Sequence, residues 1–567
     1  MSVKEVPPID KHDVEQSEGE KKISKVRLIG LFGGIILGAI VYFLIPRDAV
    51  DVITKSVGAD VIKEEEMNVG AVYLVAGIAV MMAIWWMTEA ISLAATAMVP
   101  LVLFPLLGVN DYAGTAGSYA SDTIYLFMGG FILAIAMQRW HFDRRVALGI
   151  VRIVGVKPRR LILGFMIATG FISMWVSNTA TAVMMLPIGL SVVQLFETAQ
   201  DKNAAVGKGL DVEAAYGGAI HGGVMSGLLN EGDNVASTTA EKHGIKRSNF
   251  AIGLMLAIAY SASIGSLATP IGTPPNTLLK AYMSDTLKYD INFGKWFLMG
   301  FPMVVVFTLF AWWILTFVMF KPEIDEIPGG KELINEEYAK LGKLRGGELL
   351  VMLLFILAVF CWIFVPLILK ATGIEGPKKL DAIVAMSVAV LLFIIPGKTN
   401  GERLVTWNEA KTIPWDILLL FGGGLSLSKQ FQHTGLSNYI GEMVKGLAGA
   451  PIVIIVLAVA ALVLALTELT SNTATAAAFL PIIGGVAMGI GLQGPNVMIL
   501  TIPAALAATC AFMLPVATPP NAIAYGSGYL KIADMIKGGF IIALVGLVLI
   551  TITVFALAIP IFGLALP

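Results

Sequence analysis

Long apolar stretches alternate with short polar ones along most of this chain of 567 residues. A window of about 20 residues, the length of helix that crosses roughly 30 Å of hydrocarbon, detects apolar stretches from residue 27 onward. Nine of them fit uninterrupted membrane-spanning helices, at 27–45, 71–87, 90–108, 124–138, 296–320, 348–369, 380–396, 414–430 and 538–564. The pattern predicts an all-α polytopic membrane protein.

Four further apolar stretches are interrupted by polar residues. Those at 161–197 and 451–493 carry Ser-Asn-Thr near the middle, so each is expected to fold as a re-entrant hairpin of two half-length helices. Those at 250–288 and 497–530 contain Thr-Pro-Pro-Asn, whose prolines remove backbone donors and break a helix. Together with the nine ordinary spans, the two broken helices give about 11 transmembrane helices plus two re-entrant hairpins.

The interruptions occur as two matched sets. SNTATAVMMLPI begins at Ser177 and SNTATAAAFLPI at Ser471, with nine of the twelve positions identical. Each phrase is followed by a Thr-Pro-Pro-Asn, at Thr273 and again at Thr518. Duplicated breaks inside membrane-length segments are typical of secondary transporters, in which two repeats build the substrate site where they meet.

The distribution of basic residues indicates how the two repeats are oriented. With the N-terminus in the cytoplasm, the segment 139–160 lies inside and carries seven Lys and Arg residues, whereas its counterpart 433–454 carries only Lys445. Because basic residues accumulate on the cytoplasmic face, the repeats are predicted to be inverted. The loops 321–347 and 397–413 also fall inside by this count, with five and three basic residues.

This layout divides the chain into four parts. They are a cytoplasmic N-terminal tail (1–26), a first inverted repeat with a preceding helix (27–320), a cytoplasmic linker (321–347) and a second inverted repeat (348–567). The charged tail excludes a signal peptide, so an uncleaved, multi-pass protein of the plasma membrane is expected. The first repeat is longer because of a polar, glycine-rich insertion at 199–247, to which we assign no chemistry.

Composition agrees with a membrane protein. Hydrophobic residues make up 57% of the chain and charged residues 14%, and the mean hydropathy is +0.81. The net charge of −1 gives no indication of a nucleic acid partner. Cys361 and Cys510 lie in separate apolar segments, where no structural disulfide is expected.

The chemistry of a broken helix suggests what these interruptions bind. Free N–H groups at the start of a half-helix favour an anion, while unpaired carbonyls at the end of another can coordinate a small cation. Asn, Ser and Thr side chains both donate and accept hydrogen bonds. Two such sets meeting near the middle of the bilayer suit a ligand with two carboxylates.

Charge compensation decides which ions accompany such a ligand. None of the four interrupted segments has a basic residue at its break, since Lys280 lies well past the break in 250–288, so no fixed cation is expected at the site. A dianion without compensation would cost several kcal/mol, so cations must accompany it or another anion must replace it. We expect sodium rather than protons, because Glu468 is the one candidate for a proton carrier and is better interpreted as a structural acid bonded to helix ends.

The motifs SNTATAVMMLPI and SNTATAAAFLPI, with GTPPN at Gly272 and ATPPN at Ala517, resemble the signature of the divalent anion/sodium symporter family. Residues from about 27 to 564 resemble its bacterial sodium-dependent dicarboxylate transporters. The resemblance implies a homodimer. Each protomer would have a scaffold domain and a transport domain that carries both hairpins and moves across the membrane as an elevator.

The same resemblance implies a set of binding residues. Sodium would be held, in several cases through backbone carbonyls, by Ser173, Ser177, Asn178 and Gly272 in one site and by Thr467, Thr470, Asn472 and Ala517 in the other. The substrate carboxylates would meet Asn178, Thr179 and Thr273 from one half and Asn472, Thr473, Thr518 and Pro519 from the other. Ser173 and Thr467 each lie four residues before their Ser-Asn-Thr, so the duplication itself supports these two positions.

The leading hypothesis is therefore a secondary transporter that takes up C4-dicarboxylates such as succinate, malate and fumarate, driven by two or more sodium ions. A dicarboxylate exchanger of the same fold, or a tricarboxylate or sulfate symporter, remains an alternative, because the motifs do not reveal coupling or pocket volume. An enzyme is not expected. A membrane-embedded hydrolase would need a motif such as His-Glu-x-x-His or Gly-x-Ser-x-Gly, and the chain has neither.

Overall fold

A computed structural model of the protein describes residues 25–206, 247–327, 329–397 and 401–566. The N-terminal tail up to residue 24 and most of the 199–247 insertion therefore lie outside the described residues. Within those ranges the structure is helical, and extended pairing is limited to a bridge between Pro396 and Arg403. Nine of the described helices are long and apolar enough to cross a membrane, and four shorter apolar helices accompany them. The predicted all-α membrane fold is confirmed.

The stretches predicted as ordinary spans are all helical. Eight of them form α2 (Lys25–Leu44), α5 (Val72–Thr88), α9 (Asp122–Arg139), α17 (Phe293–Trp313), α19 (Gly347–Thr372), α20 (Leu380–Ile394), α22 (Trp415–His433) and α28 (Ile532–Thr553). The stretch 90–108 differs, because it forms two short helices, α6 (Leu93–Ala97) and α7 (Val99–Leu106). Pro100 lies in the first turn of α7, where its missing N–H removes no helical bond, and this favours a new helix start inside an apolar run.

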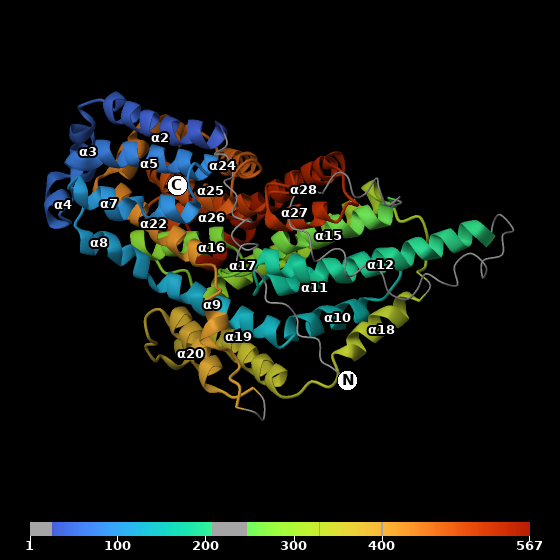
Figure 1. Ribbon diagram of the computed structural model, residues 1–567. Helices are drawn as coiled ribbons and strands as arrows, with labels where there is room; N and C mark the ends of the chain where they lie inside the picture. The colour runs from blue at the N-terminus through green and yellow to red at the C-terminus, as the bar shows by residue number, and fades with distance from the viewer. Residues whose placement is uncertain (1–24, 207–246, 328, 398–400, 567) are drawn as a thin grey trace, which may run out of the picture.

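Both Ser-Asn-Thr stretches fold into two-helix hairpins as predicted, but their second arms are not half-length, since the helices that begin at Asn178 and Asn472 are long enough to cross a membrane. The first consists of α11 (Pro158–Ser173) and α12 (Asn178–Val206), and the second of α24 (Ile452–Thr467) and α25 (Asn472–Gly489). Figure 1 shows α11 and α12 on the right-hand side of the molecule and α25 to the left of its centre. In each hairpin the first arm ends at a hydroxyl residue and the second begins at the asparagine of the motif.

Both Thr-Pro-Pro-Asn stretches break a helix in two. The first gives α15 (Asn249–Ser266) and α16 (Pro274–Ala281), and the second gives α26 (Met498–Thr509) and α27 (Pro519–Gly526). The later half-helix begins at the first proline of the motif in both cases, at the position where a proline costs no hydrogen bond. The chain between the halves, 267–273 and 510–518, forms no regular helix.

Three of the segments with excess basic residues lie together at one end of the molecule. In α10 (Phe142–Val154), Arg144 forms an ion pair of 2.6 Å with Glu337 of α18 (Gly330–Lys340), which belongs to the 321–347 linker. Arg139, at the end of α9, forms another of 2.6 Å with Glu409 in the 397–413 loop. These contacts fit the charge count, which assigned all three segments to one side of the membrane.

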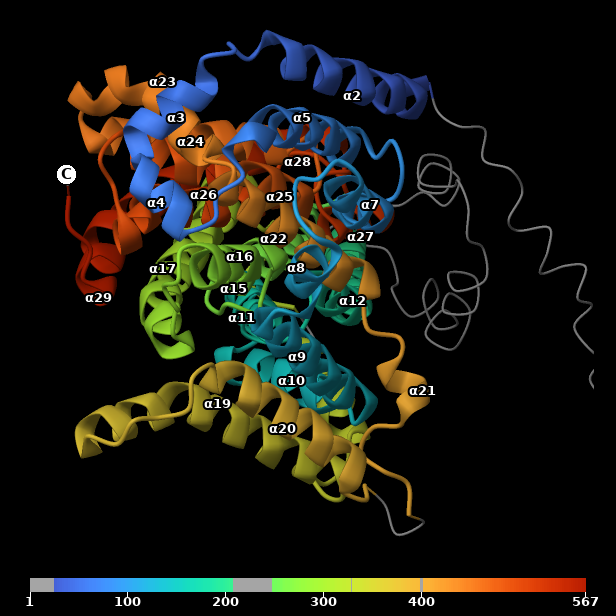
Figure 2. The same cartoon turned by 90° about the vertical axis from the view of Figure 1, so that its left-hand side faces the viewer.

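The outer helices carry apolar side chains on exposed surfaces. Figure 2 shows α19 and α20 beside α9 and α10 at one edge of the molecule, with α2 at the opposite edge. On α2, which packs along α5, Ile29 and Phe43 are 71% and 70% exposed. Exposed apolar surface of this kind is stable in contact with lipid and unstable in contact with water.

Close helix crossings depend on glycine. A Cβ atom added to Gly265 of α15 would lie 2.2 Å from the carbonyl oxygen of Gly170 in α11, so the two backbones touch there. Gly129 of α9 meets the backbone of Ala385 in α20, and its counterpart Gly423 in α22 meets the backbone of Ala97 in α6. The Gly170–Gly265 crossing sets the distance between the ends of α11 and α15, which carry site residues.

We expect Gly265→Ala to destabilise the protein by about 1–3 kcal/mol, because the new methyl group meets backbone that cannot rotate away. Thermal unfolding in detergent measures the effect as a lower midpoint temperature. Gly33→Ala in α2 is the matched control, since a Cβ there meets nothing within 4 Å and alanine is the better helix former. A Gly265→Ala protein that unfolds at the wild-type temperature would contradict this account of the crossing.

Candidate functional site

One cavity of about 830 Å³ brings both hairpin tips and both broken helices together. Its lining includes the first residues of α12, α16, α25 and α27, so the starts of four helices face one space. Unpaired N–H groups and the helix dipole make each helix start favourable for an anion. The arrangement therefore concentrates positive potential in the cavity without placing a basic side chain at any of the four breaks.

All but two of the residues singled out from the sequence line this cavity. They are Ser177, Asn178, Thr179, Gly272, Thr273, Thr470, Asn472, Thr473, Ala517, Thr518 and Pro519. The other two, Ser173 and Thr467, are fully buried and lie behind the lining, in contact with its two asparagines. Two motifs separated by about half the chain thus contribute to a single site.

Local hydrogen bonds determine where the half-helices begin. The Ser177 hydroxyl accepts a hydrogen bond from the Ala180 N–H at 3.3 Å, which caps the start of α12. The Thr518 hydroxyl accepts from the Asn521 N–H, also at 3.3 Å, and caps α27. The Thr273 and Thr509 hydroxyls lie 3.4 Å apart, which joins the break of the first repeat to the end of α26 in the second.

Oxygen atoms gather behind the tip of the first hairpin. The hydroxyl of Ser173 lies 2.8 Å from Oδ1 of Asn178 and 2.6 Å from the backbone oxygen of Ala262 in the last part of α15. A hydroxyl has one proton and can donate to only one of these oxygens. The other oxygen is left without that donor and is available to a small cation.

The second hairpin repeats this arrangement. The hydroxyl of Thr467 lies 2.7 Å from Oδ1 of Asn472 and 2.7 Å from the backbone oxygen of Ala508 in α26. Two equivalent clusters therefore each combine a hydroxyl, a carboxamide oxygen and a backbone carbonyl near the end of a helix that breaks. Hydroxyl, amide and carbonyl oxygens are the groups that hard cations prefer.

The asparagines that end the two Thr-Pro-Pro-Asn motifs have a role that the sequence analysis missed. Nδ2 of Asn276 donates to the Thr269 carbonyl oxygen at 3.0 Å, and Nδ2 of Asn521 donates to the Leu514 carbonyl oxygen at 3.0 Å. Each side chain thus holds the irregular segment of its own repeat, and both are fully buried. The signal was present in the sequence, because the motif ends in asparagine in both copies.

Glu468 supports the second break as a structural acid, in agreement with its interpretation from the sequence. Its carboxylate accepts hydrogen bonds from the backbone N–H groups of Phe512 at 2.7 Å and of Met513 at 3.0 Å. The equivalent position in the first repeat is Met174, whose carbonyl oxygen accepts a hydrogen bond from the Thr269 hydroxyl at 2.5 Å. The two repeats therefore tie the hairpin tip to the break by different groups.

Three charged residues also line the cavity, and the expectation that no fixed cation is present there needs correction. Arg27 of α2 lies in the lining beside Glu89, with an ion pair of 3.4 Å, and Asp416 of α22 lines another part. The Arg27 and Glu89 side chains are about half exposed, so their pair contributes little energy. The sequence search missed Arg27 because it covered only the interrupted segments.

Comparison with known proteins identifies the family. A family model described as the sodium:sulfate symporter transmembrane region matches residues 64–564. The chain is 36% identical to the sodium-dependent dicarboxylate transporter SdcS of Staphylococcus saprophyticus in an alignment of 563 residues. This alignment covers 98% of each chain. It is 38% identical to the transporter of the same name from Staphylococcus aureus strain USA300 in an alignment of 486 residues. This alignment covers 85% of each chain.

Among solved structures, the YdaH transporter of Alcanivorax borkumensis aligns with 81% of this chain and 88% of its own, at a TM-score of 0.47 and 13% identity, too weak a likeness to carry an inference. The family model and the two relatives are sufficient without it, since the model spans most of the chain and the relatives align over nearly their whole length. The protein therefore belongs to the divalent anion/sodium symporter family, whose members are multi-pass membrane transporters.

Proposed function

We propose that this protein is a secondary active transporter that takes up C4-dicarboxylates such as succinate, malate and fumarate together with sodium ions. The carrying observation is the pair of matched oxygen clusters, at Ser173–Asn178 and Thr467–Asn472, beside four helix starts in one cavity. The clusters suit two small cations and the helix starts suit a ligand with two carboxylates. The names of both relatives describe the same coupling and the same substrate class.

In this proposal each repeat binds one sodium ion and part of the substrate. Sodium is held by Ser173, Ser177, Asn178 and Gly272 in one repeat and by Thr467, Thr470, Asn472 and Ala517 in the other. The substrate carboxylates are bound by Asn178, Thr179 and Thr273 on one side and by Asn472, Thr473, Thr518 and Pro519 on the other. Sodium bound beside the carboxylates compensates their charge in a region of low dielectric constant, which removes a cost of several kcal/mol.

The proposal includes the arrangement of the protein in the cell. The protein is a homodimer in the plasma membrane, its N-terminus is cytoplasmic, and 27–320 and 348–567 are inverted repeats that supply the scaffold and transport domains of an elevator. It performs no catalysis. Arg27, near the start of α2, lines the cavity, which supports a cavity mouth on the side of the N-terminal tail.

Uptake of labelled succinate into proteoliposomes tests the coupling. Uptake should require an inward sodium gradient and should fall to background when potassium replaces sodium, because two neutral oxygen clusters must be filled before the dianion enters. Malate and fumarate should compete with succinate, and citrate and sulfate should compete weakly. Uptake that depends on internal dicarboxylate and ignores the sodium gradient would instead identify an exchanger, and stronger inhibition by sulfate or citrate would reassign the substrate.

Asn178→Ala and Asn472→Ala should each reduce succinate uptake at least about tenfold, since either change removes a group shared by a sodium site and the substrate. Expression and the elution volume in size-exclusion chromatography should stay at wild-type values. Asn408→Ala, an exposed asparagine in the 397–413 loop, is the control and should transport normally. Normal uptake by either site variant would refute these site assignments.

The buried hydroxyls allow a separate test of the sodium sites. Thr467→Ala should raise the sodium concentration that gives half-maximal uptake by about tenfold, because loss of one liganding hydroxyl costs on the order of 1–1.5 kcal/mol. Thr467→Ser retains the hydroxyl and should leave that concentration near the wild-type value. An equal increase in both variants would assign the effect to the methyl group of Thr467, and no increase in either would remove Thr467 from the sodium site; the assignment fails in both cases.

A further inference from the structure

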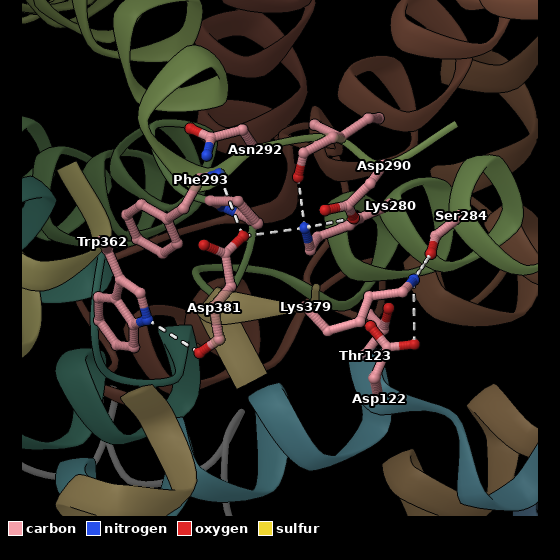
Figure 3. A network of polar contacts seen from close by, with 12 residues as sticks. Asp122, Thr123, Lys280, Ser284, Asp290, Asn292, Phe293, Trp362, Lys379 and Asp381 are labelled. Carbon is pink, nitrogen blue, oxygen red and sulfur yellow. Dashed lines mark hydrogen bonds and ion pairs between the residues drawn. The ribbon is translucent and has the colours of Figure 1, made fainter. Parts of the chain in front are cut away.

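A buried ion pair connects the substrate cavity to a helix that contributes nothing to it. The first turns of α16 carry Thr273 and Asn276 at the break, and Lys280 follows on the same short helix. The Lys280 side chain is 2% exposed, and its Nζ lies 3.0 Å from Oδ2 of Asp381 and 3.3 Å from Oδ1 of Asp290 (Figure 3). It also donates to the backbone oxygen of Ile291. An ammonium group buried to this extent requires such partners.

The two carboxylates belong to different parts of the fold. Asp290 follows Lys280 in the connection between the π-helix η4 (Tyr282–Thr286) and α17, so it stays with Lys280 in any movement of that segment. Asp381 lies in the first turn of α20, which packs along α9 and α19. Neither α19 nor α20 contributes a described residue to the cavity. The Lys280–Asp381 pair therefore crosses from a segment that carries site residues to a helix that carries none.

Other contacts follow the same boundary. Oδ2 of Asp381 accepts a hydrogen bond from the Phe293 N–H at 3.1 Å, and the Phe293 ring stacks on Trp362 of α19 with ring centroids 4.7 Å apart. Lys379, two residues before Asp381, contacts the hydroxyl of Ser284 in η4 and forms an ion pair of 3.2 Å with Asp122 of α9 (Figure 3). Lys280 and Asp381 are thus buried beside this aromatic packing, whereas Asp290 and Lys379 at the margin of the network are partly exposed.

The duplication shows that the cavity itself does not need this ion pair. When the two Thr-Pro-Pro-Asn motifs are aligned, Lys280 corresponds to Tyr525, which cannot carry a positive charge. The second repeat nevertheless forms its hairpin tip, its oxygen cluster and its break in the same manner. A group required for ligand binding would be expected in both repeats. The ion pair therefore serves a function other than ligand binding, for which one copy per protein is enough.

We propose that Lys280 releases one of its two carboxylate partners during transport. It contacts both Asp381 and Asp290 in the conformation described here, and it releases Asp381 but keeps Asp290 when the helices that carry the site move relative to α19 and α20. The inference rests on the proposed function, because a transporter exposes its site alternately by moving one helix bundle against another. The Lys280–Asp381 pair is then a latch that favours this conformation over the one open to the other side of the membrane.

The surroundings of each charge make the release energetically feasible. Removing one partner of a buried ion pair is strongly unfavourable when the other charge is left alone. Lys280 is not left alone, because Asp290 remains beside it, and the Asp290 side chain is 46% exposed and already hydrated. Asp381 retains its position at the start of α20, where the helix dipole favours a negative charge. Each charge therefore has a second source of stabilisation on its own side of the boundary.

The two aspartates should then have opposite effects on the conformational equilibrium. Asp381→Asn weakens the latch, so the present conformation becomes less populated. Asp290→Asn removes the partner that Lys280 keeps after release, so the present conformation becomes more populated or stays dominant. A purely structural ion-pair network predicts the same direction for both changes, because both remove a negative charge next to the same lysine.

Labelling of a cysteine in the cavity measures this equilibrium without relying on uptake. Val516 lines the cavity and is 83% exposed, so Val516→Cys provides a reporter for a membrane-impermeant maleimide. Labelling is measured on right-side-out and on inverted vesicles. The vesicle orientation in which the wild-type reporter protein is labelled faster is then used for all variants. Reporter-free protein corrects for the native cysteines, of which Cys510 is buried and Cys361 is partly exposed.

Asp381→Asn should slow reporter labelling about threefold to tenfold at the chosen face, and Asp290→Asn should leave it unchanged or faster. The double variant Lys280→Met with Asp381→Asn removes both charges of the buried pair, so no unpaired charge is left in the interior and the protein should still fold. Its reporter should be labelled as slowly as that of Asp381→Asn. Wild-type labelling rates in the folded double variant, or equal slowing by both aspartate variants, would overturn the latch. Absence of sodium-dependent uptake in the wild type would overturn the proposed function instead, whatever the labelling rates.

Discussion

Hydrocarbon offers no hydrogen bonds, so every interruption of a membrane-embedded helix leaves backbone groups that must find partners inside the protein. The four polar interruptions that the sequence reveals gather around one cavity in the part of the chain that the structure describes. Asn276, Asn521 and Glu468 satisfy part of the freed backbone, and a bound ion or anion can satisfy more. The freed backbone N–H and C=O groups, which would be unfavourable without hydrogen-bond partners, are thus the groups that can bind a ligand selectively. They are held in place before any ligand arrives.

The duplicated motifs made much of this site predictable. Polar residues at matching depths of two apolar stretches indicated both hairpin tips, and prolines indicated both breaks, because these signals act locally on the backbone. Arg27, Glu89 and Asp416 could not be found in this way, since they lie outside the four interrupted segments and reach the cavity through packing between distant helices. The interruption of 90–108 was also missed, because Pro100 stands in an apolar run without a polar residue beside it.

The two repeats agree in their candidate binding groups and differ in the contacts that support those groups. Each places a hydroxyl between a carboxamide oxygen and a helix-end carbonyl. The first repeat ties its tip to the break through Thr269 and carries Lys280, whereas the second uses Glu468 and has Tyr525 in place of the lysine. The candidate binding groups therefore follow the duplication, and the differences between the repeats lie in the contacts around those groups.

The crossing of Gly170 and Gly265 has a mechanical consequence. Ser173 follows Gly170 by three residues, and Ala262 precedes Gly265 by three, so the two oxygen-bearing positions flank a point where one backbone rests directly on another. Side chains can rotate and absorb small displacements, but backbone in direct contact cannot. Any displacement of Ser173 is therefore transmitted directly to α15 through this backbone contact, and from there to the irregular segment that presents Thr273.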